Sequence, residues 1–418
     1  MELKKYNANH TKVLKINQIV RTVSETHRFD KDKLIAINTS DVENGVMGSG
    51  TLTSVDELKG QFKKTIVKDD ILFSEIRPAN RRFAKVTTED TKDYVVSTKL
   101  MVLRKYNEDV DLEYFYYCLT NQPFLDILQR RAENRIGSFP QITFDLLSEY
   151  AFPIPPISEQ KRISSVISTL DKKIALNRAI NQNLEAMAKQ LYDYWFVQFD
   201  FPNKDGKPYK SSGGEMVWNE KLKRMIPKEW TNANIYQLAS ISKETVNPQA
   251  HPNELFKHYS LPEYDKTGTY AEEYGIDIQS AKFIVTNNCI LVSKLNPWTS
   301  RVICGNRGSN QICSTEFVVW NPASLKTKGF LFMLAKSAKF IEYCTQGATG
   351  TSHSHRRINP ELMMKFDFPY NSEIAIKFSL LIENIIVHLH NNIAQLKVLT
   401  KQRDELLPLL MNGQITIE

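Results

Sequence analysis

The 418-residue chain is longer than one ordinary domain, and its length predicts two or three domains. Hydrophobic residues make up 42% of it and charged residues 24%, which is typical of a globular protein and excludes wholesale disorder. The net charge of +7 permits a polyanionic partner such as nucleic acid but does not require one. Five scattered cysteines form no C-x-x-C pair, and no stretch has the roughly 18 apolar residues of a membrane helix. We therefore expect reduced thiols, a cytoplasmic location and no membrane span.

The first half of the chain is expected to mix strands and helices. Residues 66–73 and 95–103 are rich in β-branched side chains and predict strands. Residues 112–129, and residues 328–343 in the second half, carry apolar side chains at helical spacing and predict helices. Each of these helices is followed by a polar loop that contains glycine.

The second half of the chain repeats the first. The segment ILFSEIRP at residues 71–78 returns as ILVSKLNP at 290–297, a displacement of 219. VVSTKL at 95–100 returns as ICSTEF at 312–317, a displacement of 217, and a third match follows at 216. The displacement changes by only three residues and in one direction, as small loop deletions would produce. The sequence therefore predicts an internal duplication.

A long helix is expected after each half, because apolar residues recur at alternating steps of four and three. The first series is Ile163, Ile167, Leu170, Ile174, Asn177, Asn181 and Leu184. The second is Phe378, Ile382, Ile385, Leu389, Asn392 and Leu396. The two superpose at a displacement of 215, so that Asn177 falls on Asn392. This spacing favours a coiled coil, with a pair of ordinary amphipathic core helices as the alternative.

The segment between the halves carries distinctive motifs. PPISEQKRI at 155–163, LDKKI at 170–174 and the pair WF at 195–196 are followed by a polar linker and by IPKEW at 226–230. These motifs resemble the central conserved region of the specificity subunits of type I restriction-modification systems. The C-terminal region departs from that family, because YNSE at 370–373 stands where a second proline pair with Glu-Gln is expected.

The resemblance implies an α+β fold with two similar mixed α/β target-recognition domains, related by pseudo-twofold symmetry and separated by two long antiparallel coiled-coil helices. Each domain would read one half of a bipartite, asymmetric site in double-stranded DNA. The helices would set the spacer and dock two modification (methyltransferase) subunits, which bind S-adenosylmethionine, and restriction subunits would join them. A helix of about 35 residues is about 50 Å long, which spans roughly 15 base pairs. The chain itself is expected to be non-catalytic, with no cofactor of its own.

The expected boundaries combine the repeat with the resemblance. They are a first recognition domain at 1–154, a central long helix at 155–198, a linker at 199–229, a second recognition domain at 230–371 and a C-terminal long helix at 372–412.

DNA contacts are expected from basic and amide side chains in one turn and one loop of each half, because phosphates attract Lys and Arg while base edges need bidentate groups. The first-half candidates are Arg77, Asn80, Arg81, Arg82, Arg130, Arg131, Arg135, Ser138 and Gln141. Those of the second half are Lys294, Asn296, Trp298, Arg301, Thr349, Ser352, His353, His355, Arg356 and Arg357. For any one arginine, a solvated surface charge is the alternative.

Catalytic motifs are not found in the sequence. The proline pair at 155–156 lacks the [DNS]-P-P-[YF] context of adenine methylation, and there is no Walker A motif. His353 and His355 have no cysteine or carboxylate partners at zinc spacing, so no metal site is expected. Two alternatives stay open: a free-standing DNA-binding or adaptor protein, and a reader fused to an unrecognised nuclease or methyltransferase activity.

Overall fold

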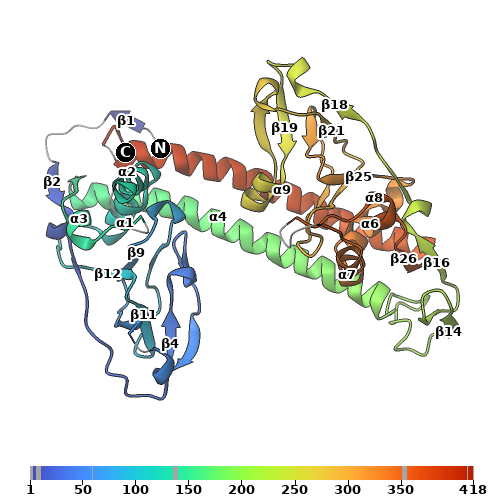
Figure 1. Cartoon of the computed structure of the whole chain (residues 1–418), viewed down its shortest axis with the longest axis horizontal. Helices are drawn as coiled ribbons and strands as arrows, with labels where there is room; N and C mark the ends of the chain where they lie inside the picture. Colours follow the sequence, from blue (N-terminus) through green and yellow to red (C-terminus); the bar gives the residue numbers. More distant parts are fainter. Residues whose placement is uncertain are drawn as a thin grey trace. The chain divides into compact units, whose positions relative to one another are not determined.

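The computed structural model describes residues 3–5, 11–58, 60–134, 140–350, 355–411 and 413–417 (Figure 1). It divides into two compact units. Unit 1 comprises Met1–Ile174 and Val398–Glu418, and unit 2 comprises Ala175–Lys397. Both contain strands and helices, which confirms the α+β class. None of the described helices is long and apolar enough to cross a membrane.

Unit 1 is built on two sheets. The first has the order β10-β9-β12-β3 and is antiparallel throughout. Its strands are Phe83–Lys85, Ile71–Ser74, Leu100–Lys105 and Val20–Thr22. The second has the order β7-β4-β11-β8, in which β4 and β11 run parallel. Its strands are Thr51–Ser54, Lys33–Ile37, Tyr94–Ser97 and Phe62–Lys64.

Unit 2 repeats this strand order and adds one strand, β18, to its second sheet, which confirms the duplication. Its first sheet has the order β17-β25-β22-β23, with strands Ala239–Ile241, Phe317–Pro322, Ile290–Ser293 and Val302–Cys304. Its second has the order β18-β21-β24-β19-β20, and β19 and β24 are again parallel. Its strands are Thr245–Val246, Lys282–Ile284, Gln311–Cys313, Leu255–Tyr259 and Ala271–Tyr274. The register is also repeated, because Ser74 pairs with Leu100 as Ser293 pairs with Phe317.

Shorter elements complete each unit. In unit 1, β2 (Lys12–Lys15) pairs with β13 (Ala151–Ile154), and α3 spans Phe144–Ser148. In unit 2, β16 (Thr231–Asn234) pairs with β26 (Asp367–Tyr370), and α5 and α8 span Leu261–Thr267 and Pro360–Met364.

Several predicted elements differ from the observed ones. The strand predicted at 66–73 begins only at Ile71, because Val67 and Asp70 close a turn in which Asp69 has a φ of 70°. The segment 95–103 forms two strands, β11 and β12, rather than one.

Both predicted short helices are broken near their middles. The first becomes α1 (Leu112–Thr120) and α2 (Gln122–Glu133), because Asn121 has extended backbone and caps α2 through its side chain. The second becomes α6 (Lys328–Ala335) and α7 (Ala338–Gln346), with Ser337 capping α7. The two caps lie at equivalent places in the repeat.

The two long helices are α4, Ile157–Tyr192, and α9, Ser372–Met411. Every heptad position in the two series is buried or half-buried. Within unit 2, Asn177 donates to Gln395 at 3.3 Å and Asn392 donates to Asn181 at 3.0 Å. Residue numbers rise along one helix as they fall along the other, so the pairing is antiparallel as predicted.

The segment predicted as a linker is part of the core of unit 2. It contains a hairpin of β14 (Met216–Asn219) and β15 (Arg224–Pro227), which was not predicted from the sequence. Phe199 and Phe201 are buried against Trp230, with ring centroids 5.3 and 5.1 Å away. These aromatic side chains therefore pack at the end of α4 as part of the core of unit 2.

Candidate nucleic-acid interface

Each unit has a sharp turn at the carboxyl end of a central strand, β9 in unit 1 and β22 in unit 2. Ser74 Oγ accepts a hydrogen bond from the backbone N–H of Ile76 at 3.1 Å, and Ser293 Oγ accepts one from Leu295 at 3.2 Å. The residue that follows is left-handed in both units, with φ of 47° at Arg77 and 48° at Asn296. The local sequence therefore produces the same turn twice.

The predicted turn and the predicted loop lie side by side within each unit. In unit 1 the Arg77 N–H donates to the Pro140 carbonyl at 3.0 Å, and Ile76 bridges to Gln141. In unit 2 the equivalent bond joins Asn296 to the Arg356 carbonyl at 2.7 Å. We call the turn and the loop of one unit together its turn–loop frame. In unit 1 it consists of the turn after β9 and the loop at Pro140 and Gln141, and in unit 2 of the turn after β22 and the loop at Arg356. Backbone hydrogen bonds hold both frames together.

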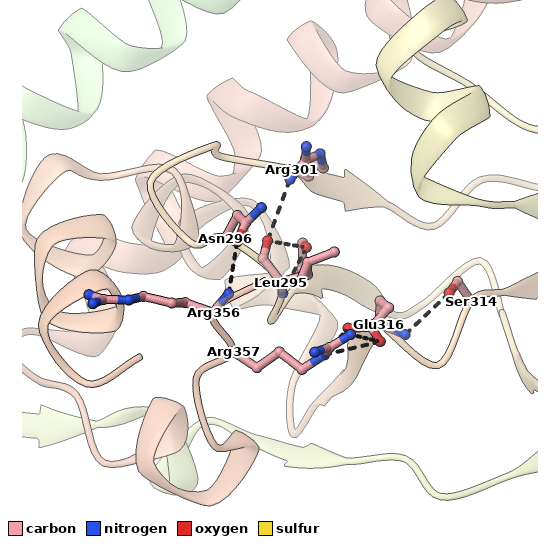
Figure 2. Close-up of polar contacts among 8 residues, drawn as sticks. Leu295, Asn296, Arg301, Ser314, Glu316, Arg356 and Arg357 are labelled. Atoms are coloured by element: carbon pink, nitrogen blue, oxygen red, sulfur yellow. Dashed lines mark hydrogen bonds and ion pairs between the residues drawn. The ribbon is translucent and has the colours of Figure 1, made fainter. Parts of the chain in front are cut away.

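Two arginines in the frame of unit 2 are held by carboxylates, and Figure 2 shows the pair of Arg357 with Glu316. Arg357 contacts Glu316 through Nε, at 2.9 Å to Oε2, and through Nη2, at 3.0 Å to Oε1. These bonds raise the pKa of the Arg357 guanidinium. Arg301 binds Asp265 of α5 in the same two-pronged way, at 2.6 and 2.8 Å. Figure 2 shows the Arg356 side chain pointing away from that of Arg357.

The arginines on the turn of unit 1 are held by different partners. Arg81 donates from Nε to Asn44 at 2.7 Å and from Nη1 to Gln122 at 2.5 Å. Burial lowers the pKa of Arg81. Arg82 donates to the Ser40 carbonyl at 3.1 Å and lies 3.5 Å from a carboxylate oxygen of Glu43. Arg81 and Arg82 thus support the turn as much as they offer charge at its surface.

Other candidates are placed at the surface of the frames. Arg130 and Arg131 are exposed in the last turn of α2, where cations also complement the helix dipole. The Trp298 side chain is 44% exposed, unusually open for so large an apolar group. The exposed set also includes Arg77, Asn80, Thr349 and His355, and Lys294 is half-buried. Arg135, Ser138, Ser352 and His353 lie outside the described residues.

The partners of the arginines were missed by the sequence analysis. Asp265, Glu316 and Asn44 are acidic or amide residues far from their partners in the chain, so no local pattern marks them. The repeat could have drawn attention to Glu316, because Glu316 aligns with Lys99 and the charge at that position is reversed.

No group of three or more potential metal ligands is found among the residues that the structure describes. All five cysteines are buried as free thiols, and burial raises the pKa of Cys118 to about 12. A cysteine nucleophile needs the opposite shift, so these side chains are core residues.

Comparisons with known proteins agree with this architecture. Residues 12–186 match the family model for the type I restriction modification DNA specificity domain. The HindI specificity subunit of Haemophilus influenzae is 28% identical over 455 residues, covering 96% of this chain and 98% of the relative. The MjaIX specificity subunit of Methanocaldococcus jannaschii is 24% identical over 319 residues, covering 73% and 69%.

A solved structure shares the fold. The crystal structure of the type I restriction-modification S subunit from M. genitalium superposes with a TM-score of 0.60 at 14% sequence identity, covering 98% of both chains. The family model covers residues 12–186, whereas the HindI relative and the solved structure extend over both units. In sequence the chain is similar to type I restriction-modification specificity subunits, and it shares the fold of one of them.

Proposed function

We propose that this chain binds double-stranded DNA and gives a type I restriction-modification complex its sequence specificity. Each unit reads one half of a bipartite, asymmetric site. The observation that carries the proposal is the turn–loop frame, which the same backbone bonds build twice while its side chains differ. A constant frame with variable side chains suits two readers of different half-sites.

The paired helices are proposed to act as the spacer ruler and as the docking surface for two modification subunits. Support comes from the antiparallel bonds of Asn177 and Asn392 and from heptad positions that are covered along both helices. Restriction subunits join the modification subunits, and S-adenosylmethionine binds to the latter. This chain contributes no catalytic group and holds no cofactor.

The test is selection from a random duplex library. The full chain, purified with the modification subunits of the same system, is expected to enrich two short sequences at a fixed spacing. Recovery of a single contiguous motif would contradict the two-reader proposal. Methylation or cleavage by the chain alone would support the alternative, in which a reader carries its own enzyme activity.

A second experiment tests the ruler. Deleting one heptad from both long helices is expected to shorten the preferred gap and to leave both half-site sequences unchanged. The matched control deletes one heptad from α4 alone, which breaks the pairing and is expected to abolish a fixed gap. Changed half-sites in the double deletion would contradict a ruler function.

A further inference from the structure

Three segments meet at one corner of the frame in unit 1. The N–H of Glu75 donates to the carbonyl of Lys99 at 3.0 Å, and the Glu75 carbonyl accepts from Ile142 at 2.8 Å. Gln141 Nε2 then donates to Glu75 Oε2 at 2.9 Å. The carboxylate of Glu75 therefore holds the amide of Gln141.

The same corner exists in unit 2 with other side chains. Lys294 donates its N–H to the Glu316 carbonyl at 2.9 Å, and its own carbonyl accepts from Ile358 at 3.0 Å. Glu316 here binds the guanidinium of Arg357 through both carboxylate oxygens, as Figure 2 shows. The Arg357 side chain stays 45% exposed, while that of Glu316 is 25% exposed.

The acidic residue changes place between the two corners. In unit 1 it is Glu75, which follows the central strand β9. In unit 2 it is Glu316, which lies in the turn between β24 and β25. A lysine takes the other position each time, Lys99 in unit 1 and Lys294 in unit 2. In both corners a carboxylate binds the side chain at the equivalent loop position, Gln141 or Arg357. The interaction is therefore conserved between the units, although the carboxylate comes from different positions of the repeat.

The chemistry of the two held side chains differs. Gln141 uses one amide N–H on Glu75, which leaves the second N–H and the carbonyl, the pair that matches adenine. Arg357 donates from Nε and from one hydrogen of Nη2 to Glu316. Its Nη1 and the second hydrogen of Nη2 remain, and these two donors match the acceptors N7 and O6 of guanine. A carboxylate that holds the amide or the guanidinium in one orientation reduces the side-chain conformational entropy that is lost when the group binds a base.

We propose that Glu75 and Glu316 are positioning residues for base reading. Glu75 presents Gln141 to adenine in the half-site of unit 1, and Glu316 presents Arg357 to guanine in the half-site of unit 2. The inference rests on the proposed DNA-binding function and deepens it by assigning a base preference to one position in each half-site.

The test is Glu316→Gln in the full chain with its modification subunits, by selection from random duplexes. Discrimination for guanine at one position of one half-site is expected to fall about tenfold, with the other half-site unchanged. The slope of log affinity against log salt is expected to steepen by up to about 0.9, because the Arg357 charge is no longer neutralised. A residue with only a structural role would weaken binding to all sequences alike and would leave the guanine preference at that position unchanged.

Glu215→Gln is the matched control, because it removes an exposed carboxylate paired with Lys228 at 2.9 Å in the same unit. It is expected to leave base profile and salt slope unchanged. Glu316→Asp should restore part of the guanine preference, and Glu75→Gln should relax an adenine position in the other half-site. If the wild-type chain selects a bipartite site and Glu316→Gln selects the same site equally well, the positioning inference is wrong. If the wild type selects no site, the proposed function fails instead.

Discussion

The two units share a backbone and differ in how they anchor their side chains. In unit 1, neutral Asn44 and Gln122 hold Arg81, whereas in unit 2 the carboxylates Asp265 and Glu316 hold arginines. The frames themselves rest on equivalent backbone bonds. Different surface side chains thus support the same backbone frame, so they can be exchanged while the fold is kept.

The largest expected effect comes from the helix position that is Ile163 in unit 1 and Phe378 in unit 2. Phe378 is fully buried against Trp195 and Phe196, with ring centroids 5.6 and 5.0 Å away. Phe378→Ala is expected to destabilise unit 2 by about 3–5 kcal/mol, through reduced apolar burial and the cavity left behind. Ile163→Ala is expected to cost unit 1 about 2–5 kcal/mol.

Urea unfolding followed by tryptophan fluorescence separates the two variants. All tryptophans lie in unit 2, at Trp195, Trp218, Trp230, Trp298 and Trp320. Phe378→Ala should therefore move the fluorescence midpoint to lower urea, while Ile163→Ala moves only the circular-dichroism signal. Equal shifts in fluorescence would mean that the units unfold as one.

A second prediction exchanges one corner for the other. The triple variant Glu75→Lys, Lys99→Glu, Gln141→Arg gives unit 1 the side chains of unit 2. Its preferred base at one position is expected to change from adenine to guanine, with about tenfold discrimination, because the guanidinium fork replaces the amide. Selection from random duplexes measures the change. Gln141→Arg alone is the control, and an equally sharp guanine preference there would show that the carboxylate has no positioning effect.

A third prediction compares the equivalent arginines Arg82 and Arg301. Arg301 makes a two-pronged contact with Asp265 and its side chain is 12% exposed, whereas Arg82 has backbone carbonyls and a longer ion pair. Arg301→Ala is expected to lower the free energy of unfolding of unit 2 by about 1–2 kcal/mol, more than Arg82→Ala lowers that of unit 1. Thermal unfolding of both variants, with Asp265→Asn as partner control, tests this. A larger destabilisation by Arg82→Ala would reverse the ranking.

The sequence predicted the features that depend on periodicity. The repeat and the heptads extend over many residues, so single departures such as Asn177 do not hide them. It failed where one residue decides, as at Asn121, whose side-chain cap divides a helix that apolar spacing alone predicts as continuous. Contacts such as Arg301 with Asp265 join residues 36 apart and leave no local pattern. Such partners become visible only when the fold brings them together.

The smallest expected effect concerns phosphate binding at the end of α2. Arg130 and Arg131 are exposed there, whereas the equivalent end of α7 has Gln346 and Gly347. Arg130→Ala with Arg131→Ala should make the salt dependence of DNA binding shallower, by up to about 0.9 in slope for each phosphate that is no longer neutralised. Affinity should fall alike for all sequences, because phosphates carry no base information.

The reverse change sharpens the comparison. Gln346→Arg adds a cation at the equivalent exposed position of unit 2 and should steepen the slope by up to about 0.9. Lys210→Ala, which removes an exposed charge from the segment between the two repeats, is the control for net charge alone. Salt titrations by fluorescence anisotropy on one specific and one scrambled duplex give the slopes. If Lys210→Ala changes the slope as much as the Arg130 and Arg131 substitutions, general charge accounts for the effect and the end of α2 does not bind a phosphate.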